Sequence, residues 1–122
     1  MTTTTDTIDT YLAAYNEPDE DSRRELVARA FAEGGALVDP PIDGAGHDGI
    51  SAMMGAVHQQ YPGHRFRRAS AVDEHHGYFR YGWELRSPDE AVVLEGTDVG
   101  FVDDAGRLAR VVGFFGPLPD QA

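Results

Sequence analysis

One aspartate in the second half of the chain is surrounded by residues that cannot ionise. If residues 91–102 form a strand, alternate side chains share a face, and the companions of Asp98 are Val92, Leu94, Gly96, Gly100 and Val102. Burial among such neighbours would raise the pKa of the carboxyl, because desolvation disfavours its charged form. A protonated carboxyl can donate a hydrogen bond to a developing oxyanion. The spacing alone leaves open that Asp98 faces solvent or caps a backbone N–H.

Two side chains in the first half could complete such chemistry. Asp39 ends an apolar run, and the fixed φ angles of Pro40 and Pro41 would hold its carboxylate in one direction. Tyr11 lies on the apolar stripe of an expected helix, where its hydroxyl could reach past the apolar layer. Structural alternatives remain, because Asp before Pro often starts a loop and a buried tyrosine is often a core residue.

Helices are expected to position these residues in the first half. Apolar residues at helical spacing predict a helix over about 6–16, with the stripe Ile8, Tyr11, Leu12 and Tyr15. A second helix is expected from about residue 19 to Gly34-Gly35, burying Leu26, Val27, Ala30 and Phe31. A brief strand at 36–39 and a loop at 42–47 lead to a third helix, which begins near Asp48 and ends before Tyr61.

The second half is patterned as strands. Apolar side chains alternate with polar or small ones in the run Phe79, Tyr81, Trp83 and Leu85. Further strands are expected over about 65–73, 91–102 and 108–115, and the short turns between them imply antiparallel pairing. Helices followed by a meander of strands place residues 1–122 in one domain of the α+β class.

Composition excludes several kinds of site. The chain has no cysteine, and its ten basic residues are all arginine, which removes thiolate chemistry and lysine Schiff bases. The net charge of -11 disfavours nucleic acid as a partner. No apolar run approaches the roughly 20 residues that cross a bilayer, and the N-terminus lacks a signal-peptide pattern. We therefore expect a cytoplasmic protein that does not bind membranes.

The histidines do not predict a metal centre. His75 and His76 are adjacent, so on a strand their side chains would point to opposite faces, and a turn at His75-His76-Gly77 is favoured instead. We expect neither a metal nor another cofactor.

Three segments carry a resemblance to a known family: Phe31–Pro40 (FAEGGALVDP), Gly46–Ile50 (GHDGI) and Gly96–Leu108 (GTDVGFVDDAGRL). Over nearly its whole length the chain resembles the nuclear transport factor 2-like superfamily, and within it the SnoaL-like polyketide cyclases and the ketosteroid isomerases. The resemblance implies a cone-shaped fold, in which a curved antiparallel sheet wrapped by three N-terminal helices encloses a pocket. It also implies a homodimer formed through the sheet.

The similarity to ketosteroid isomerases implies roles for individual residues. Asp39 would shuttle the proton, while Asp98 and Tyr11 would form the oxyanion hole. Supporting tyrosines of some ketosteroid isomerases are replaced here by Phe31 and Met54, so the network that orients Tyr11 is reduced. The residues expected to contact the substrate are Phe31, Met54, Phe79, Tyr81, Trp83, Leu94 and Phe115.

Two functions follow as hypotheses. The first is a cofactor-independent isomerase or cyclase that abstracts a proton beside the carbonyl of an apolar, steroid- or polyketide-like molecule. The alternative is a non-catalytic ligand-binding or dimerisation domain of the same fold. Epoxide hydrolysis would need an arginine between two aspartates, and no pattern places Arg80 or Arg110 on the face of Asp98.

Overall fold

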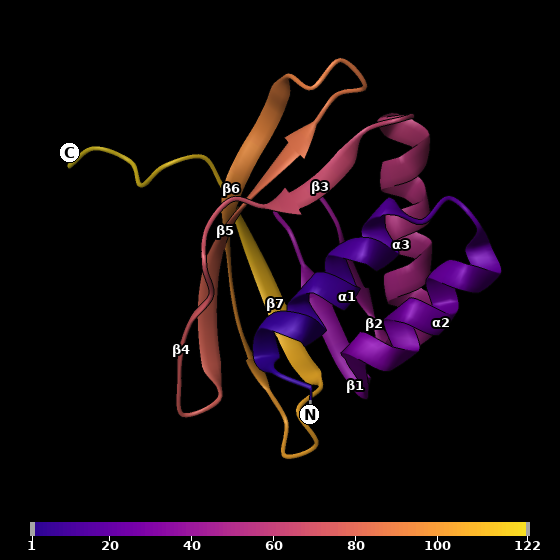
Figure 1. Cartoon of the computed structure of the whole chain (residues 1–122), viewed down its shortest axis with the longest axis vertical. Coiled ribbons are helices and arrows are strands. Elements are labelled where there is room, and N and C mark those ends of the chain that lie inside the picture. Colours follow the sequence, from indigo (N-terminus) through magenta and orange to yellow (C-terminus); the bar gives the residue numbers. More distant parts are fainter. Residues whose placement is uncertain (1, 122) are drawn as a thin grey trace.

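Three helices pack against one face of a curved sheet: α1 (Thr4–Asn16), α2 (Glu20–Ala30) and α3 (Gly46–Gln60) (Figure 1). The computed structural model describes residues 2–121. A reciprocal capping box starts α1, where Thr3 Oγ1 accepts from the Asp6 N–H and the Asp6 carboxylate accepts from the Thr3 N–H. Within the described residues, every helix is too short or too polar to cross a membrane.

The sheet has seven strands: β1 (Phe31–Val38), β2 (Asp43–Ala45), β3 (Arg65–Arg68), β4 (Asp73–His75), β5 (Tyr78–Arg86), β6 (Val92–Val102) and β7 (Leu108–Phe115). Their order is β2-β1-β7-β6-β5-β3, with β4 also paired to β5, so the sheet has two ends and does not close. It is mixed, because β1 runs parallel to β7. This corrects the expectation of a purely antiparallel sheet: α3 and five strands (β2 to β6) intervene before the chain returns to pair with β1.

The apolar residues of the two clearest sequence patterns, on α1 and β5, form much of the core. Ile8, Tyr11, Leu12 and Tyr15 are all buried on the inner side of α1, which confirms the helical stripe. On β5 the alternating residues Phe79, Tyr81, Trp83 and Leu85 are buried, which confirms the period-two pattern. Most of these side chains belong to one buried cluster, which packs α1 over the inner face of the sheet.

The expected second helix is too long. The helix α2 ends at Ala30, and Phe31 is already extended (φ -102°, ψ 143°) as the first residue of β1. The pairing of β1 with β7 is interrupted between Phe31 and Ala36, and an ideal Cβ at Gly35 would lie 3.0 Å from the Leu108 carbonyl oxygen. The glycines therefore serve a bulge against β7 and not a helix end.

Smaller boundary corrections concern the segments around α3. The loop expected at 42–47 contains the short strand β2, and α3 begins at Gly46 without a side-chain cap. Asp48 lies in the first turn of α3, where its charge suits the helix dipole. The single strand expected at 65–73 is divided into β3 and β4, because residues 69–72 leave the ladder.

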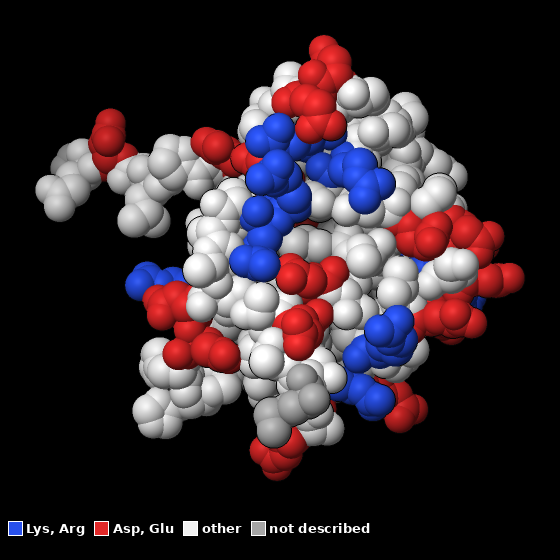
Figure 2. Space-filling view, viewed as in Figure 1, with Lys and Arg blue, Asp and Glu red and all other residues white. Residues whose placement is uncertain are grey.

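Arginine side chains gather around β3 in Figure 2, although the protein is acidic. They are paired with carboxylates of the same chain: Glu84 contacts Arg67 at 3.2 Å and Arg86 at 2.7 Å, and Asp9 contacts Arg68 at 2.8 Å. The outer face of the sheet also exposes the aromatic residues Tyr78, Phe101 and Phe114.

Candidate active site

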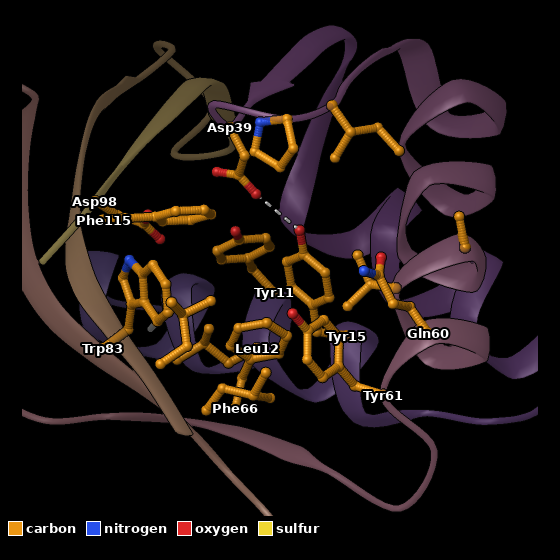
Figure 3. A pocket seen from close by; sticks show the side chains of 16 residues that line it. Tyr11, Leu12, Tyr15, Asp39, Gln60, Tyr61, Phe66, Trp83, Asp98 and Phe115 are labelled. Carbon is orange, nitrogen blue, oxygen red and sulfur yellow. Dashed lines mark hydrogen bonds between the residues drawn. The ribbon is translucent and has the colours of Figure 1, made fainter. Parts of the chain in front are cut away.

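A cavity of about 350 Å³ lies between the inner face of the sheet and the helices α1 and α3 (Figure 3). Most of its lining is apolar, including Leu12, Phe66, Trp83, Leu94 and Phe115. Its polar side chains are Tyr11, Tyr15, Asp39, Gln60, Tyr61 and Asp98. An apolar hollow with a few convergent polar groups is typical of a small-molecule site.

Asp98 points into this cavity from β6 and is only 3% exposed. This result overturns the alternative that its side chain faces solvent. Tyr81, directly opposite on β5, donates a hydrogen bond of 2.5 Å from its hydroxyl to Asp98 Oδ2. Burial raises the pKa of Asp98 to about 7, and the hydrogen bond from Tyr81 partly opposes the rise. Asp98 is thus largely protonated below neutral pH.

Asp39 reaches the same cavity from the turn that follows β1. Its backbone exchanges hydrogen bonds with Ile42, at 3.0 Å and 3.3 Å, so the predicted turn and the position in the cavity both hold. The Tyr15 hydroxyl donates to Asp39 Oδ2 at 3.2 Å. Burial raises the pKa of Asp39, and the hydrogen bond from Tyr15 acts in the opposite direction. Because Asp98 is the more deeply buried of the two, Asp39 is the carboxyl that ionises first.

The two carboxyl groups converge on Gly113 of β7. An ideal Cβ at Gly113 would collide with Asp39 Oδ1 and lie 3.1 Å from Asp98 Oδ1. The two Oδ1 atoms therefore lie close together beside this glycine. In each carboxyl group, Oδ2 accepts a hydrogen bond from a tyrosine and Oδ1 is turned toward Gly113. The charge of Asp39 also contributes to the raised pKa of Asp98.

Tyr11 completes the polar end of the cavity. It is 2% exposed, and its ring packs edge-on against Tyr15 and Phe31, with centroids 5.5 Å and 5.4 Å apart. Figure 3 shows its hydroxyl pointing toward the two aspartates. Burial, with the nearby Asp98 charge, raises the pKa of Tyr11 well above its usual value. Tyr11 therefore remains a hydrogen-bond donor at all physiological pH values.

Comparison with known proteins places this architecture in a family. No family model and no curated protein matches the chain, whereas many solved structures do. One is a candidate isomerase of the SnoaL-like family from Agrobacterium tumefaciens, 44% identical, which covers 96% of this chain and 100% of its own with a TM-score of 0.89. The chain belongs to the SnoaL-like family.

More distant structures share the fold of this SnoaL-like chain. A candidate SnoaL-like polyketide cyclase from Jannaschia is 13% identical, with a TM-score of 0.67 over 89% of this chain and 84% of its own. An NTF2-like protein of unknown function from Exiguobacterium is 19% identical, with a TM-score of 0.67 over 92% and 99%. At these identities the likeness establishes the backbone arrangement alone.

The SnoaL-like fold brings Asp39, Asp98 and Tyr11 to one cavity from three separate elements. Of the expected contact residues, Trp83, Leu94 and Phe115 line it. The other four lie outside the lining, in the buried core: Phe31, Met54, Phe79 and Tyr81.

The reasons for these four corrections lie in the packing. Phe31 lies under the Tyr11 ring, and the Phe79 ring lies against the backbone of Gly100. The helix α3 turns Met54 into the core, and only its next turn reaches the cavity. Tyr81 is placed behind Asp98 and acts on the site through that carboxyl.

Sequence reasoning missed several lining residues of the SnoaL-like site. Tyr15 is the most important, because it binds Asp39, and its position four residues after Tyr11 on the same stripe was a usable signal. Phe66 lies on a weakly patterned strand, and Tyr61 follows the last turn of α3. Neither position had a local signal for a cavity.

We expect Tyr15→Phe to raise the pKa of Asp39. The phenylalanine keeps the ring contacts but removes the hydroxyl that favours the ionised carboxylate. The acidic limb of any Asp39-dependent activity should therefore move to higher pH, and an NMR titration of the Asp39 carboxyl carbon measures the shift directly. Tyr61→Phe is the matched control. Tyr61 also lines the cavity, but in the described structure its hydroxyl makes no hydrogen bond to Asp39 or Asp98. Identical titrations for Tyr15→Phe and wild type would refute the assigned hydrogen bond.

Proposed function

We propose that this SnoaL-like protein removes a proton from the carbon beside a carbonyl group of an apolar small molecule, without a cofactor. The observation that carries the proposal is the convergence of two carboxyl groups of unequal burial on one apolar cavity. Environments that separate the pKa values of two acids allow one to act as base and the other as hydrogen-bond donor. Tyr11 supplies a second donor at the same end.

In the proposed reaction Asp39, ionised, takes the proton from the carbon next to the carbonyl. The electron pair of the broken C–H bond forms the enolate, and the negative charge develops on the carbonyl oxygen. Tyr11 and protonated Asp98 donate hydrogen bonds to that oxygen, where such donors lower the barrier most. Asp39 then returns the proton to another carbon of the conjugated enolate, which isomerises the ligand. Alternatively, the enolate carbon attacks a second carbonyl and closes a ring, and Asp39 returns the proton to the alkoxide that this attack forms.

The cavity supports an apolar carbonyl compound as the ligand class, of the steroid or polyketide kind. Its walls are aromatic and aliphatic, and its volume lies at the small end of the range for ligand sites, which is roughly 300–1,000 Å³. The names of two relatives agree with this chemistry: one is a candidate isomerase and another, from Sinorhizobium meliloti, is a candidate polyketide cyclase.

The test is proton exchange in heavy water, which requires no knowledge of the natural product. Flat apolar ketones, such as β-tetralone and a 3-oxo-Δ5 steroid, are incubated with the protein, and mass spectrometry follows deuterium uptake beside the carbonyl. We expect uptake well above the buffer rate, and the steroid reports isomerisation as well. Ketones that bind in the cavity but exchange at the buffer rate would refute proton abstraction. That outcome would favour the alternative, a non-catalytic binding domain.

A further inference from the structure

Tyr81 acts on the cavity from outside its lining. The side chain is only 2% exposed, yet its hydroxyl donates a hydrogen bond of 2.5 Å to Asp98 Oδ2. Tyr81 and Asp98 lie directly opposite each other in the pairing of β5 with β6. The Tyr81 ring also stacks on Phe79, with centroids 6.1 Å apart. The strand register and this contact together fix the direction in which the hydroxyl donates.

The hydrogen bond from Tyr81 determines which oxygen of Asp98 carries the proton. Burial and the nearby Asp98 charge raise the pKa of Tyr81 well above its usual value, so the phenol keeps its own proton. Within residues 2–121, Asp98 Oδ2 is the only acceptor of that hydroxyl. If Oδ2 were protonated, it would donate to the phenol oxygen and leave the buried Tyr81 O–H without an acceptor, which is unfavourable. The satisfied arrangement therefore has Oδ2 as the acceptor and the proton on Oδ1.

Oδ1 is the oxygen on the cavity side of the carboxyl group. Asp98 lines the cavity and Tyr81 does not, so the oxygen bonded to Tyr81 lies on the core side. Oδ1 is turned instead toward Gly113, where the Asp39 carboxyl also lies. A proton on Oδ1 is thus held at the polar end of the cavity.

Other groups near Asp98 affect its charge but do not make a comparable bond. The titratable groups that face it are Asp39, from the turn after β1, and two tyrosines of α1, Tyr11 and Tyr15. The Asp39 charge favours the protonated form of Asp98. Trp83, the next inward residue of β5, acts as a donor to Asp98 but lowers the pKa of the carboxyl less than Tyr81 does. Tyr81 is therefore the main hydrogen-bond donor to this acid.

We propose that Tyr81 is a positioning residue, whose hydroxyl holds the proton of Asp98 on Oδ1, the oxygen on the cavity side. Without this bond the carboxyl group could carry its proton on either oxygen and could rotate. With the bond, Asp98 is oriented as a donor before a ligand enters, which is the condition for preorganised stabilisation. The effect on turnover rests on the proposed function, whereas the control of the Asp98 proton does not.

The bond can be observed in the wild-type protein without a ligand. When the tyrosines carry carbon-13 at Cζ, the Tyr81 signal should move as Asp98 ionises, because a phenol donates more strongly to a carboxylate than to a neutral acid. We expect a midpoint at pH about 7, shared with the Asp98 carboxyl carbon. Tyr78, which is 57% exposed, should show no such change. A Tyr81 signal that stays constant while Asp98 ionises would overturn the proposal.

The variant Tyr81→Phe tests the positioning role. Phenylalanine keeps the ring but cannot donate, so the pKa of Asp98 should rise by about one pH unit as the carboxylate loses a charge-assisted hydrogen bond. At pH 6 the exchange of β-tetralone protons in heavy water should slow about tenfold, a part of what the loss of an oxyanion donor costs. Ligand affinity should change less than about twofold. Asp98 is largely protonated at pH 6 in both proteins, so the loss reports the position of the proton and not its presence.

Tyr78→Phe is the matched control, because it makes the same substitution on the same strand at an exposed position. We expect it to keep the wild-type rate and the wild-type pKa of Asp98. A folded Tyr81→Phe protein with an unchanged pKa of Asp98 would overturn the proposal. Equal losses of rate and affinity would do so as well, because they would indicate a structural role only. If Tyr81→Phe does not fold, the wild-type titration decides alone.

The two proposals fail in distinguishable ways. A raised pKa of Asp98 in Tyr81→Phe, in a protein that exchanges no ketone proton, would retain the control of the Asp98 proton and reject proton abstraction. Deuterium uptake at pH 6 that is equally fast in Tyr81→Phe and wild type would reject the positioning role and retain the reaction.

Discussion

The Asp39→Asn variant should exchange protons beside a ketone about 10²- to 10⁴-fold more slowly than the wild type, the usual contribution of a positioned general base. The amide cannot accept a proton at neutral pH, yet its oxygen can still accept the hydrogen bond from Tyr15. The turn is also preserved, because the bonds to Ile42 come from the backbone. The loss should therefore appear in the rate constant for exchange in heavy water, with ligand affinity nearly unchanged.

The matched control for this variant is Asp43→Asn. Asp43 is an exposed carboxylate four residues farther along the chain, and it does not line the cavity. We expect it to exchange at the wild-type rate. If Asp39→Asn retains full activity while binding the ketone normally, another group must be the base and the assignment of Asp39 is wrong.

The second large effect concerns stability, and it comes from Asp98. Its pKa is about 7 in the folded protein and near its ordinary value of 3.8 in the unfolded chain, so the folded state holds a proton that the unfolded state releases. The resulting stabilisation is fully present below pH about 4 and is lost as the pH rises to about 7. A difference of this size corresponds to about 4 kcal/mol.

Asp98→Asn should remove this dependence, because an amide does not titrate in this range. The free energy of unfolding of the variant minus that of the wild type should thus increase by about 4 kcal/mol between pH 4 and pH 8. Urea unfolding at several pH values measures this difference. Asp104→Asn, a substitution of an exposed turn residue, is the control. Parallel curves for Asp98→Asn and wild type would show that Asp98 ionises normally. The same ionisation removes a donor from the cavity, so activity should decline above pH about 7.

Local patterns predicted the parts of the fold that depend on local periodicity. The α1 stripe and the alternation on β5 were evident, because each apolar surface is continuous in the sequence. The same periodicity misled at Phe31, where apolar spacing continues past the end of α2 although the backbone has already become extended. The parallel pairing of Val38 with Val112 joins segments far apart in the sequence. Neither segment contains a pattern that indicates its partner strand, so this pairing could not be predicted.

The candidate site was predictable to the extent that it follows from strand faces and family likeness. Period two grouped Asp98 with apolar residues but left open whether that face is buried, and the resemblance pointed to Asp98, Asp39 and Tyr11, all of which line the cavity. The supporting hydrogen bonds were not predictable. The bond from Tyr81 to Asp98 requires the register of β5 against β6, and the bond from Tyr15 requires the position of α1 over the turn. The wall residues were partly misassigned, because burial in the core and contact with a cavity have the same sequence pattern.

The close approach of Asp39 and Asp98 depends on Gly113, because only a residue without a Cβ leaves room for both carboxyl groups. Its φ is not in the left-handed region, so the backbone would accept alanine, but the added methyl group would push Asp39 Oδ1 away and crowd Asp98 Oδ1. One nucleotide change could therefore separate the two carboxyl groups while leaving the fold and the cavity in place. In homologous chains, glycine at this position would therefore be expected where the two carboxyl groups are kept together, and a larger residue where they are not.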